Sequence, residues 1–389
     1  MLDVDGILRP YWESLRDQAG GLSLYDAHTH LGSNDPDGMK QAPEELLAAL
    51  ETADGARAVT FPMHEPDGYG PANDMVLEAA EASGGRLVAF CRVDPRRNAV
   101  EEARRCLDAG ARGIKLHPRA EHFTLAEPGV RGLVELAHER RAPILIHAGR
   151  GIPALGRDTV HLSGEFPDAR LILAHCAISD LAWLWRVLPE HPNVFIDTAW
   201  WNPADLIALF TLVAPSQVVW ASDSPYGLPL TSAVMHLRCA LQAGLGADAL
   251  RSIAGEQIAR LVAAEEAVWV GEAPGVTPPF DPLLERVVTH LISAMGRAFA
   301  RSDPEEQLAL ARLACAVGDE GPHADVFAAV LELLDLYREH YTPPTPEGRR
   351  IQPAGRFIVM ALMVARTPAV PLPPRPQAPP PRREAAEPA

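Results

Sequence analysis

The segment that decides the fold runs from residue 111 to residue 147 and reads ARGIKLHPRAEHFTLAEPGVRGLVELAHERRAPILIH. It begins with one short apolar run (111–117) and ends with another (142–147), and each run closes on a histidine. Between them, the apolar positions of VRGLVELAHERR (130–141) recur every three or four residues, which is the period of an amphipathic helix. Apolar runs with little polar alternation are typical of strands buried on both faces, as in a parallel sheet. The segment is therefore expected to form a strand, a helix and a second parallel strand.

The same alternation of apolar runs and helical stretches extends along most of the chain. The runs are LYDAHTH (24–30), ARAVTF (56–61), RLVAFC (86–91), ARGIKLH (111–117), APILIH (142–147), RLILAH (170–175), NVFID (193–197) and QVVWASD (217–223). An eighth helix is expected near residues 230–243. Eight strand–helix units predict an α/β fold, the (β/α)8 TIM barrel. A doubly wound open sheet is the alternative, but it rarely needs eight regular units, and no glycine-rich phosphate loop follows the first strand.

The composition narrows the class of protein. The 389 residues are 47% hydrophobic and 22% charged, with a formal net charge of −16. An acidic chain lacks the basic face that a nucleic-acid binder needs. The first ten residues lack a secretory pattern, and the longest apolar run (357–365) is too short to span a bilayer. Five scattered cysteines are typical of reduced thiols. We therefore expect a cytoplasmic protein that binds neither nucleic acid nor membrane.

The chain is expected to divide into four parts. These are a barrel (1–272), a linker (273–282), a helical extension (283–341) and a Pro-rich tail (342–389). The extension contains amphipathic segments that must cover their apolar faces, either against the barrel or against a second subunit, so a homodimer is one of two expectations. The tail holds 13 of the 37 prolines and is predicted to be largely disordered.

Histidines and an aspartate stand where the predicted strands end. They are His28 and His30 in the first run, His117 in the fourth, His147 in the fifth, His175 in the sixth and Asp223 in the eighth. The carboxyl ends of barrel strands meet on one face, where active sites lie. His28 and His30 are two residues apart and so point the same way. With His147 and Asp223 they would offer three imidazoles and one carboxylate, a set that suits one divalent metal ion, Zn²⁺ first and Mn²⁺, Fe²⁺ or Co²⁺ next.

The motifs YDAHTHLG, GIKLHP, ILIHAG, LILAHC and WASDSPYG resemble those of the amidohydrolase superfamily, and in particular its amidohydrolase-2 branch, which also contains metal-dependent decarboxylases. The resemblance covers roughly residues 22–265. It implies that His28, His30, His147 and Asp223 bind the metal. It further implies that Asp223 moves a proton from water to the leaving group and that His175 polarises the substrate carbonyl.

Cationic residues near the same strand ends predict an anionic substrate. Lys115 and His117 share a face of strand four. Binuclear relatives use a carboxylated lysine there to bridge two metals, whereas a cationic Lys115 would hold a substrate carboxylate; we favour the second role and a single metal. Arg92 after strand three and Arg150 after strand five are further candidates for binding such a small molecule.

These features predict a divalent-metal-dependent hydrolase that uses metal-activated water on a small amide, lactone or ester. A non-oxidative decarboxylase of a small, often aromatic, carboxylic acid is the nearest alternative, and the sequence does not separate the two. The third alternative is an inactive barrel that serves as an interaction scaffold. The complete set of metal-ligand residues argues against this last reading.

Overall fold

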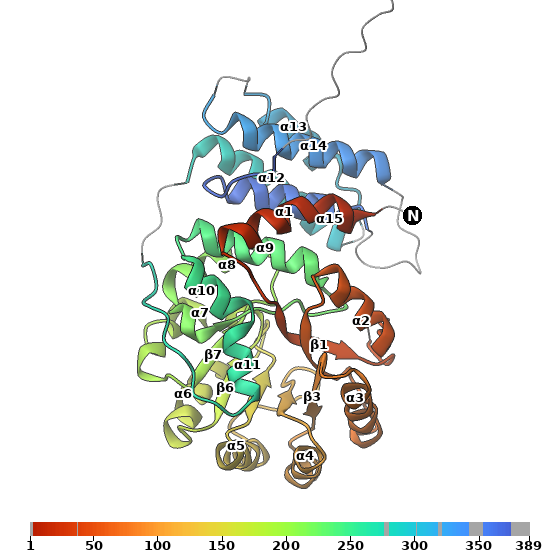
Figure 1. Ribbon diagram of the computed structural model, residues 1–389, viewed down its shortest axis with the longest axis vertical. Coiled ribbons are helices and arrows are strands. Elements are labelled where there is room, and N and C mark those ends of the chain that lie inside the picture. Colours follow the sequence, from red (N-terminus) through yellow and green to blue (C-terminus); the bar gives the residue numbers. More distant parts are fainter. Residues whose placement is uncertain are drawn as a thin grey trace, which may run out of the picture.

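Eight parallel strands, hydrogen-bonded in the order of the sequence, form the barrel that the apolar runs predict. In this computed structural model, residues 3–36, 38–275, 280–300, 302–317, 321–341 and 353–374 are described. The strands are β1 (Tyr25–Leu31), β2 (Arg57–Pro62), β3 (Leu87–Arg92), β4 (Gly113–Leu116), β5 (Pro143–Ile146), β6 (Arg170–Leu173), β7 (Val194–Asp197) and β8 (Val218–Val219). They lie in the lower part of Figure 1, with helices around them. The predicted TIM barrel is therefore confirmed.

The barrel closes where β1 meets the chain that follows β8, a junction that we call the β1–β8 seam. The His30 N–H donates to the Ser224 carbonyl (2.8 Å), and the Asp223 N–H donates to the His28 carbonyl (3.0 Å). The turn after β8 is thus fixed against the two histidines of β1. These backbone contacts bring together residues that are almost two hundred positions apart.

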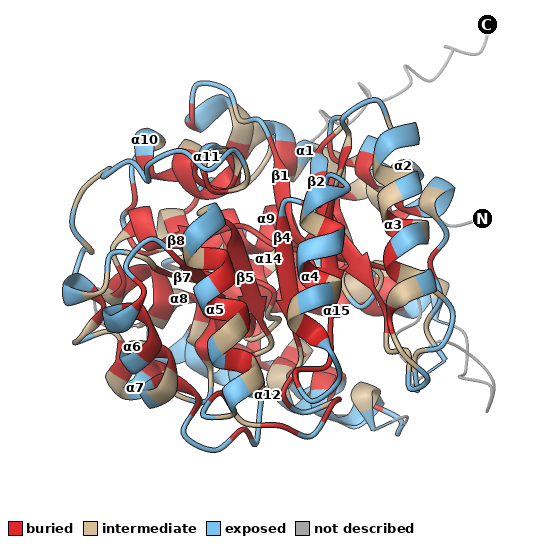
Figure 2. Cartoon of the chain, turned by 90° about the horizontal axis from the view of Figure 1, so that it is seen from below, coloured by how far each residue is buried: buried red, intermediate tan, exposed pale blue. Residues whose placement is uncertain are grey.

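Helices follow most strands and cover the outside of the barrel. They are α2 (Pro43–Thr52), α3 (Gly70–Ala82), α4 (Ala99–Asp108), α5 (Pro128–Arg140), α6 (Leu155–Glu165), α7 (Leu181–Leu184), α8 (Pro203–Leu212) and α9 (Pro229–Gln242). Two more, α10 (Ala247–Arg251) and α11 (Gln257–Val262), flank the π-helical turn Ser252–Glu256. Figure 2 shows buried strands at the centre and helices with exposed outer faces. This pattern is what amphipathic helices around an apolar sheet require.

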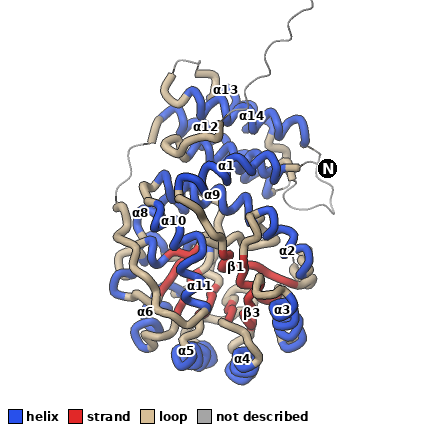
Figure 3. Tube along the Cα trace, viewed as in Figure 1, coloured by secondary structure: helices blue, strands red, loops and turns tan. Residues whose placement is uncertain are grey.

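A second group of helices packs on one side of the barrel, and we call α12–α15 the C-terminal layer. Its members are α12 (Pro282–Phe299), α13 (Glu305–Ala314), α14 (Ala324–His340) and α15 (Gly355–Arg366). The layer contacts α8 and α9 through α15, and the N-terminal helix α1 (Val4–Gln18) packs on α9 beside it (Figure 3). Within the described ranges, no helix combines the length and the apolar character that crossing a bilayer demands. The extension helices α12 and α14 are thus covered in part by α15, which itself packs on α8 and α9 of the barrel.

The prediction of a largely disordered tail from residue 342 is wrong for α15. Residues 357–365 of this helix are all buried, because α9, α12 and α14 pack around it. A helix enclosed by other helices carries apolar residues all round, so it lacks the polar face that marks an amphipathic helix in a sequence. Residues 342–352 and 375–389 of the predicted tail, and 276–279 of the predicted linker, lie outside the described residues.

Candidate metal centre

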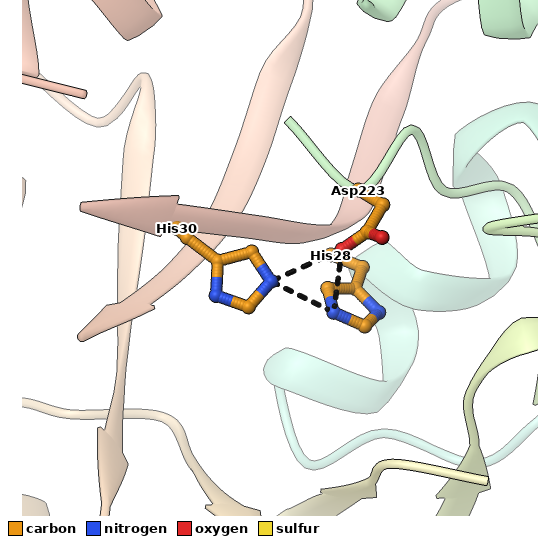
Figure 4. A group of neighbouring side chains, drawn as sticks. All are labelled: His28, His30 and Asp223. Atoms are coloured by element: carbon orange, nitrogen blue, oxygen red, sulfur yellow. Dashed lines mark hydrogen bonds and ion pairs between the residues drawn. The ribbon is translucent and has the colours of Figure 1, made fainter. Parts of the chain in front are cut away.

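The two histidines of β1 point to the same side of the strand, and Asp223 joins them across the β1–β8 seam. The Nε2 atoms of His28 and His30 are 3.2 Å apart. Asp223 Oδ1 lies 3.2 Å from the first and 3.0 Å from the second (Figure 4). Ligand atoms around a tetrahedral Zn²⁺, each 2.0–2.1 Å from the metal, are about 3.3 Å apart. The triangle therefore has the size of one face of such a site.

A carboxylate behind His28 sets which of its ring nitrogens is free. Asp197 Oδ2 lies 2.7 Å from His28 Nδ1. Because a carboxylate only accepts, Nδ1 carries the hydrogen and Nε2 presents its lone pair to His30 and Asp223. Burial holds the pKa of both histidines well below the usual value, so both rings are neutral. Neutral imidazoles are the form in which histidine binds a metal, and the carboxylate behind His28 also fixes its tautomer, so these residues fit a divalent ion.

Asp223 is held in an unusual backbone conformation in the turn beyond β8. Its φ is +63°, in the left-handed region that non-glycine residues seldom adopt. Its side chain is 21% exposed, whereas that of His28 is 1% exposed. Burial raises the pKa of the Asp223 carboxyl well above its usual value, and the Lys115 ammonium opposes this shift. Asp223 is thus the ionisable group of the cluster that is most exposed to solvent.

His147 and His175 form a second pair that contacts the first. The His175 Nδ1–H donates to the Ala199 carbonyl (2.7 Å), so His175 Nε2 accepts from His147 Nδ1 (2.9 Å). His147 Nε2 is then left unprotonated; it is buried, and no other described residue hydrogen-bonds to it. It lies outside the group of His28, His30 and Asp223, whose ligand atoms are all within 4.8 Å of one another. His147 as the fourth ligand therefore stays a prediction.

Asp197 connects the two pairs, a role that the sequence analysis did not assign. Its Oδ1 accepts the backbone N–H of His175 (2.8 Å), while its Oδ2 faces His28. His175, Cys176 and Ala177 all have positive φ, between 47° and 58°, in the turn after β6. Such strain persists where surrounding contacts hold it. The sequence signal was an aspartate at the end of the apolar run NVFID.

Lys115 is the predicted substrate-binding residue that lies closest to the metal-ligand candidates. It is fully buried, with Nζ 3.4 Å from His28 Nε2 and 4.6 Å from the centre of the Phe61 ring. Burial first, and the nearby Arg92 charge second, lower the pKa of Lys115 to about 7. Near neutral pH an amine with this pKa is present in both its neutral and its charged form, and a nearby anion favours the charged form.

The other predicted substrate-binding residues have different surroundings. Arg92 is buried and pairs with Glu121 at 2.6 Å, a carboxylate that the sequence analysis did not identify. The His117 ring stacks on that of His147, with centroids 3.8 Å apart. Arg150 is exposed in the turn after β5, and it has neither a hydrogen bond nor an ion pair with any described residue. The structure thus places Lys115 and His117 beside the two histidine pairs and pairs Arg92 with Glu121, whereas Arg150 makes no such contact.

Comparison with known proteins gives a family for the barrel. The sequence model of the amidohydrolase family matches residues 25–263, more than half of the chain. No curated protein matches the sequence. Among solved structures, an uncharacterised TIM-barrel protein from Bordetella bronchiseptica is 16% identical, with a TM-score of 0.50, and the match covers 62% of this chain and 99% of that one.

Two solved enzymes are matched over the same share of this chain. A 2,6-dihydroxybenzoate decarboxylase from Rhizobium is 15% identical (TM-score 0.49, 62% of this chain and 99% of that one). A probable 2-pyrone-4,6-dicarboxylic acid hydrolase from Acinetobacter baumannii is 14% identical (TM-score 0.47, 62% and 100%). The family match ends before the C-terminal layer begins. The chain belongs to the amidohydrolase family of enzymes.

Proposed function

We propose that this protein is a metal-dependent hydrolase that acts on a small amide, lactone or ester bearing a carboxylate. The observation that carries the proposal is the convergence of His28 Nε2, His30 Nε2 and Asp223 Oδ1 beside the buried Lys115. These three residues, with His147 Nε2 as the fourth ligand, would hold a divalent ion. Such an ion would lower the pKa of bound water and polarise the substrate carbonyl.

Asp223 is suited to move the proton in this reaction. Its carboxylate is the partly exposed member of the group, and burial raises its pKa. A carboxyl group with a raised pKa takes a proton from water more readily and returns it to the departing nitrogen or oxygen.

His175 is suited to stabilise negative charge on the carbonyl oxygen as a doubly protonated ring, with Nδ1–H kept on Ala199 and Nε2–H donated to the substrate oxygen in place of the His147 hydrogen bond. Burial lowers the pKa of His175, and the Asp197 carboxylate raises it. The Ala199 carbonyl fixes the orientation of the ring through Nδ1. A donor whose direction is fixed before the reaction stabilises developing charge without a cost of reorganisation.

Lys115 would bind the carboxylate of the substrate. An anion in contact with Nζ favours the ammonium form, which raises the pKa from about 7. Arg92 does not compete for this role, because Glu121 already compensates its charge.

The test begins with elemental analysis of protein purified without chelators, followed by a screen of lactones, amides and aromatic acids. We expect metal-dependent turnover that incorporates one ¹⁸O from solvent into a carboxylate product. His30→Ala and Asp223→Ala should abolish it, while His161→Ala, at an exposed histidine of α6, should leave it intact. Release of CO₂ from an aromatic acid without ¹⁸O incorporation would replace the hydrolase by a decarboxylase. Metal-free, inactive protein would favour the scaffold alternative.

A further inference from the structure

The C-terminal layer reaches the mouth of the barrel through Phe299, the last residue of α12. The Phe299 ring centroid lies 5.1 Å from that of Trp201, with the ring planes at 60°. Trp201 stands between β7 and α8, and therefore at the end of the barrel where the carboxyl ends of the strands lie. A helix outside the family match thus contacts the face that carries the candidate metal centre.

Aromatic contacts continue from Trp201 to the second histidine pair. The ring centroids of Trp201 and Trp200 are 6.1 Å apart, and those of Trp200 and His175 are 6.3 Å apart. Aromatic pairs at these separations stabilise one another's orientation. The series Phe299, Trp201, Trp200 and His175 therefore connects α12 to the site.

Polar contacts fix Trp200, whereas ring contacts hold Trp201. The His236 Nε2–H donates to the Trp200 carbonyl (2.9 Å), and the Trp200 indole N–H donates to Asp205 (2.6 Å). The Trp201 indole N–H has no hydrogen bond to any residue that the structure describes. The orientation of Trp201 consequently depends on the rings on either side of it.

Trp200, Trp201 and Phe299 are all half-buried, unlike the fully buried Phe61 and Phe90 of the barrel core. Each thus keeps part of its aromatic surface accessible, and Trp200 is the one that contacts His175, beside which a planar unsaturated group can stack. We propose that Phe299 is a positioning residue that holds Trp201 beside Trp200, so that the two tryptophans form a wall for the planar part of the substrate. The C-terminal layer then determines how tightly such a substrate binds. The inference rests on the proposed function only in that the substrate is bound beside His175.

The test uses benzoate as a planar probe and cyclohexanecarboxylate as a non-planar one, with binding followed by tryptophan fluorescence in the full-length, metal-loaded protein. Phe299→Leu keeps an apolar side chain for folding but removes the ring. We expect wild-type protein to prefer benzoate, and Phe299→Leu to weaken benzoate binding about three- to tenfold while changing the other probe less than about twofold. Phe299→Tyr, which keeps an aromatic ring, should retain the wild-type preference for benzoate. Leu313→Ala, at a 69% exposed position of the same layer, is the matched control and should behave as wild type.

A wild-type protein without preference for benzoate, or a Phe299→Leu protein with unchanged affinity, would overturn the inference. Equal losses in Phe299→Leu and Leu313→Ala would overturn it too, because the layer would then act through general stability. Near-UV circular dichroism tests the orientation of the tryptophans in the absence of ligand. Phe299→Leu should give a weaker tryptophan signal than wild type, whereas Leu313→Ala should not. Benzoate binding needs no turnover. If Phe299→Leu weakens benzoate binding but the protein hydrolyses none of the compounds, the proposed function is rejected and the inference about Phe299 still holds.

Discussion

Asp197 determines the protonation pattern of the site, since it faces His28 with one oxygen and the His175 backbone with the other. Asp197→Asn keeps the shape of the side chain but removes its charge. We expect metal affinity to fall about 10- to 100-fold, the usual effect of removing a carboxylate behind a metal-binding histidine. Competition with a chromogenic chelator measures this directly.

The matched control is Asp108→Asn, which removes a carboxylate from an exposed ion pair with Arg140. It should leave metal affinity within a factor of two. If Asp197→Asn binds metal as tightly as wild type, then Asp197 only supports the fold of the β6 and β7 turns.

His236 gives the fold a dependence on pH away from the metal ligands. Its Nε2–H donates to Trp200, so its Nδ1 must accept from the Thr198 hydroxyl (3.0 Å). Burial lowers its pKa from 6.5 to about 4. Between these values the unfolded chain binds more protons than the folded one, so the free energy of unfolding rises with pH and decreases as pH falls from about 6.5 to 4. The full loss is about 3 kcal/mol.

Urea unfolding between pH 4.5 and 7.5 tests this effect. A glutamine amide can donate to Trp200 and accept from Thr198 without titrating, so His236→Gln should show a shallower decrease in unfolding free energy toward acid. His161→Gln, at an exposed position, should keep the wild-type slope. Identical slopes for all three proteins would contradict the role of His236.

At the residue scale, chain periodicity predicted the orientation of one pair in the site, His28 and His30. The spacing of His28 and His30 alone places both rings on one side of a strand. The Asp197–His28 contact spans 169 positions, and Glu121 pairs with Arg92 from a loop. Asp197 has a local signal at the end of the run NVFID, whereas Glu121 has none. In both cases the identity of the partner depends on how strand ends and loops meet in three dimensions.

Among whole elements, α15 shows where periodicity fails. The run from Phe357 to Ala365 is apolar throughout, so it carries no helical repeat, and prolines surround it in the sequence. The strands, by contrast, were recognisable because each apolar run is short and is followed by an amphipathic helix. The segment forms a helix because α9, α12 and α14 pack around it, and these contacts leave no trace in the local sequence pattern.

Arg238 of α9 fastens the end of α15 to the barrel. It is buried and donates to the carbonyls of Thr367, Val370 and Pro371. Arg238→Met keeps an apolar stem but removes the donor to the Val370 and Pro371 carbonyls, while the Thr367 carbonyl keeps the Val370 N–H. We expect the free energy of unfolding to fall by about 2–4 kcal/mol in urea titrations. Arg338→Met, at a 65% exposed position of α14, should change it by less than about 0.5 kcal/mol. Equal effects in the two variants would show that the Arg238 contacts contribute nothing specific.

For the molecule as a whole, the candidate metal centre lies across the β1–β8 seam, where the barrel closes beside its shortest strand. β8 contains two residues, and its register with β7 joins only Ile196 to Val218 and Asp197 to Val219. The β1–β8 seam depends on a few backbone hydrogen bonds around His28, His30 and the turn that carries Asp223. Because these three residues come from both sides of the seam, an ion bound between them would tie the closed barrel together and bind the unfolded chain weakly.

Metal should therefore stabilise the entire fold. At a free metal concentration 1,000 times the dissociation constant, the gain in unfolding free energy is about 4 kcal/mol. For a chain of this length that corresponds to a rise in Tm of roughly 5 °C. Calorimetry of metal-loaded and chelator-treated protein measures the difference, and His30→Ala and Asp223→Asn should lose the response. If the chelator lowers Tm equally in both variants, the stabilising metal is bound elsewhere. If the chelator does not change the Tm of wild-type protein, metal binding does not stabilise the closed barrel.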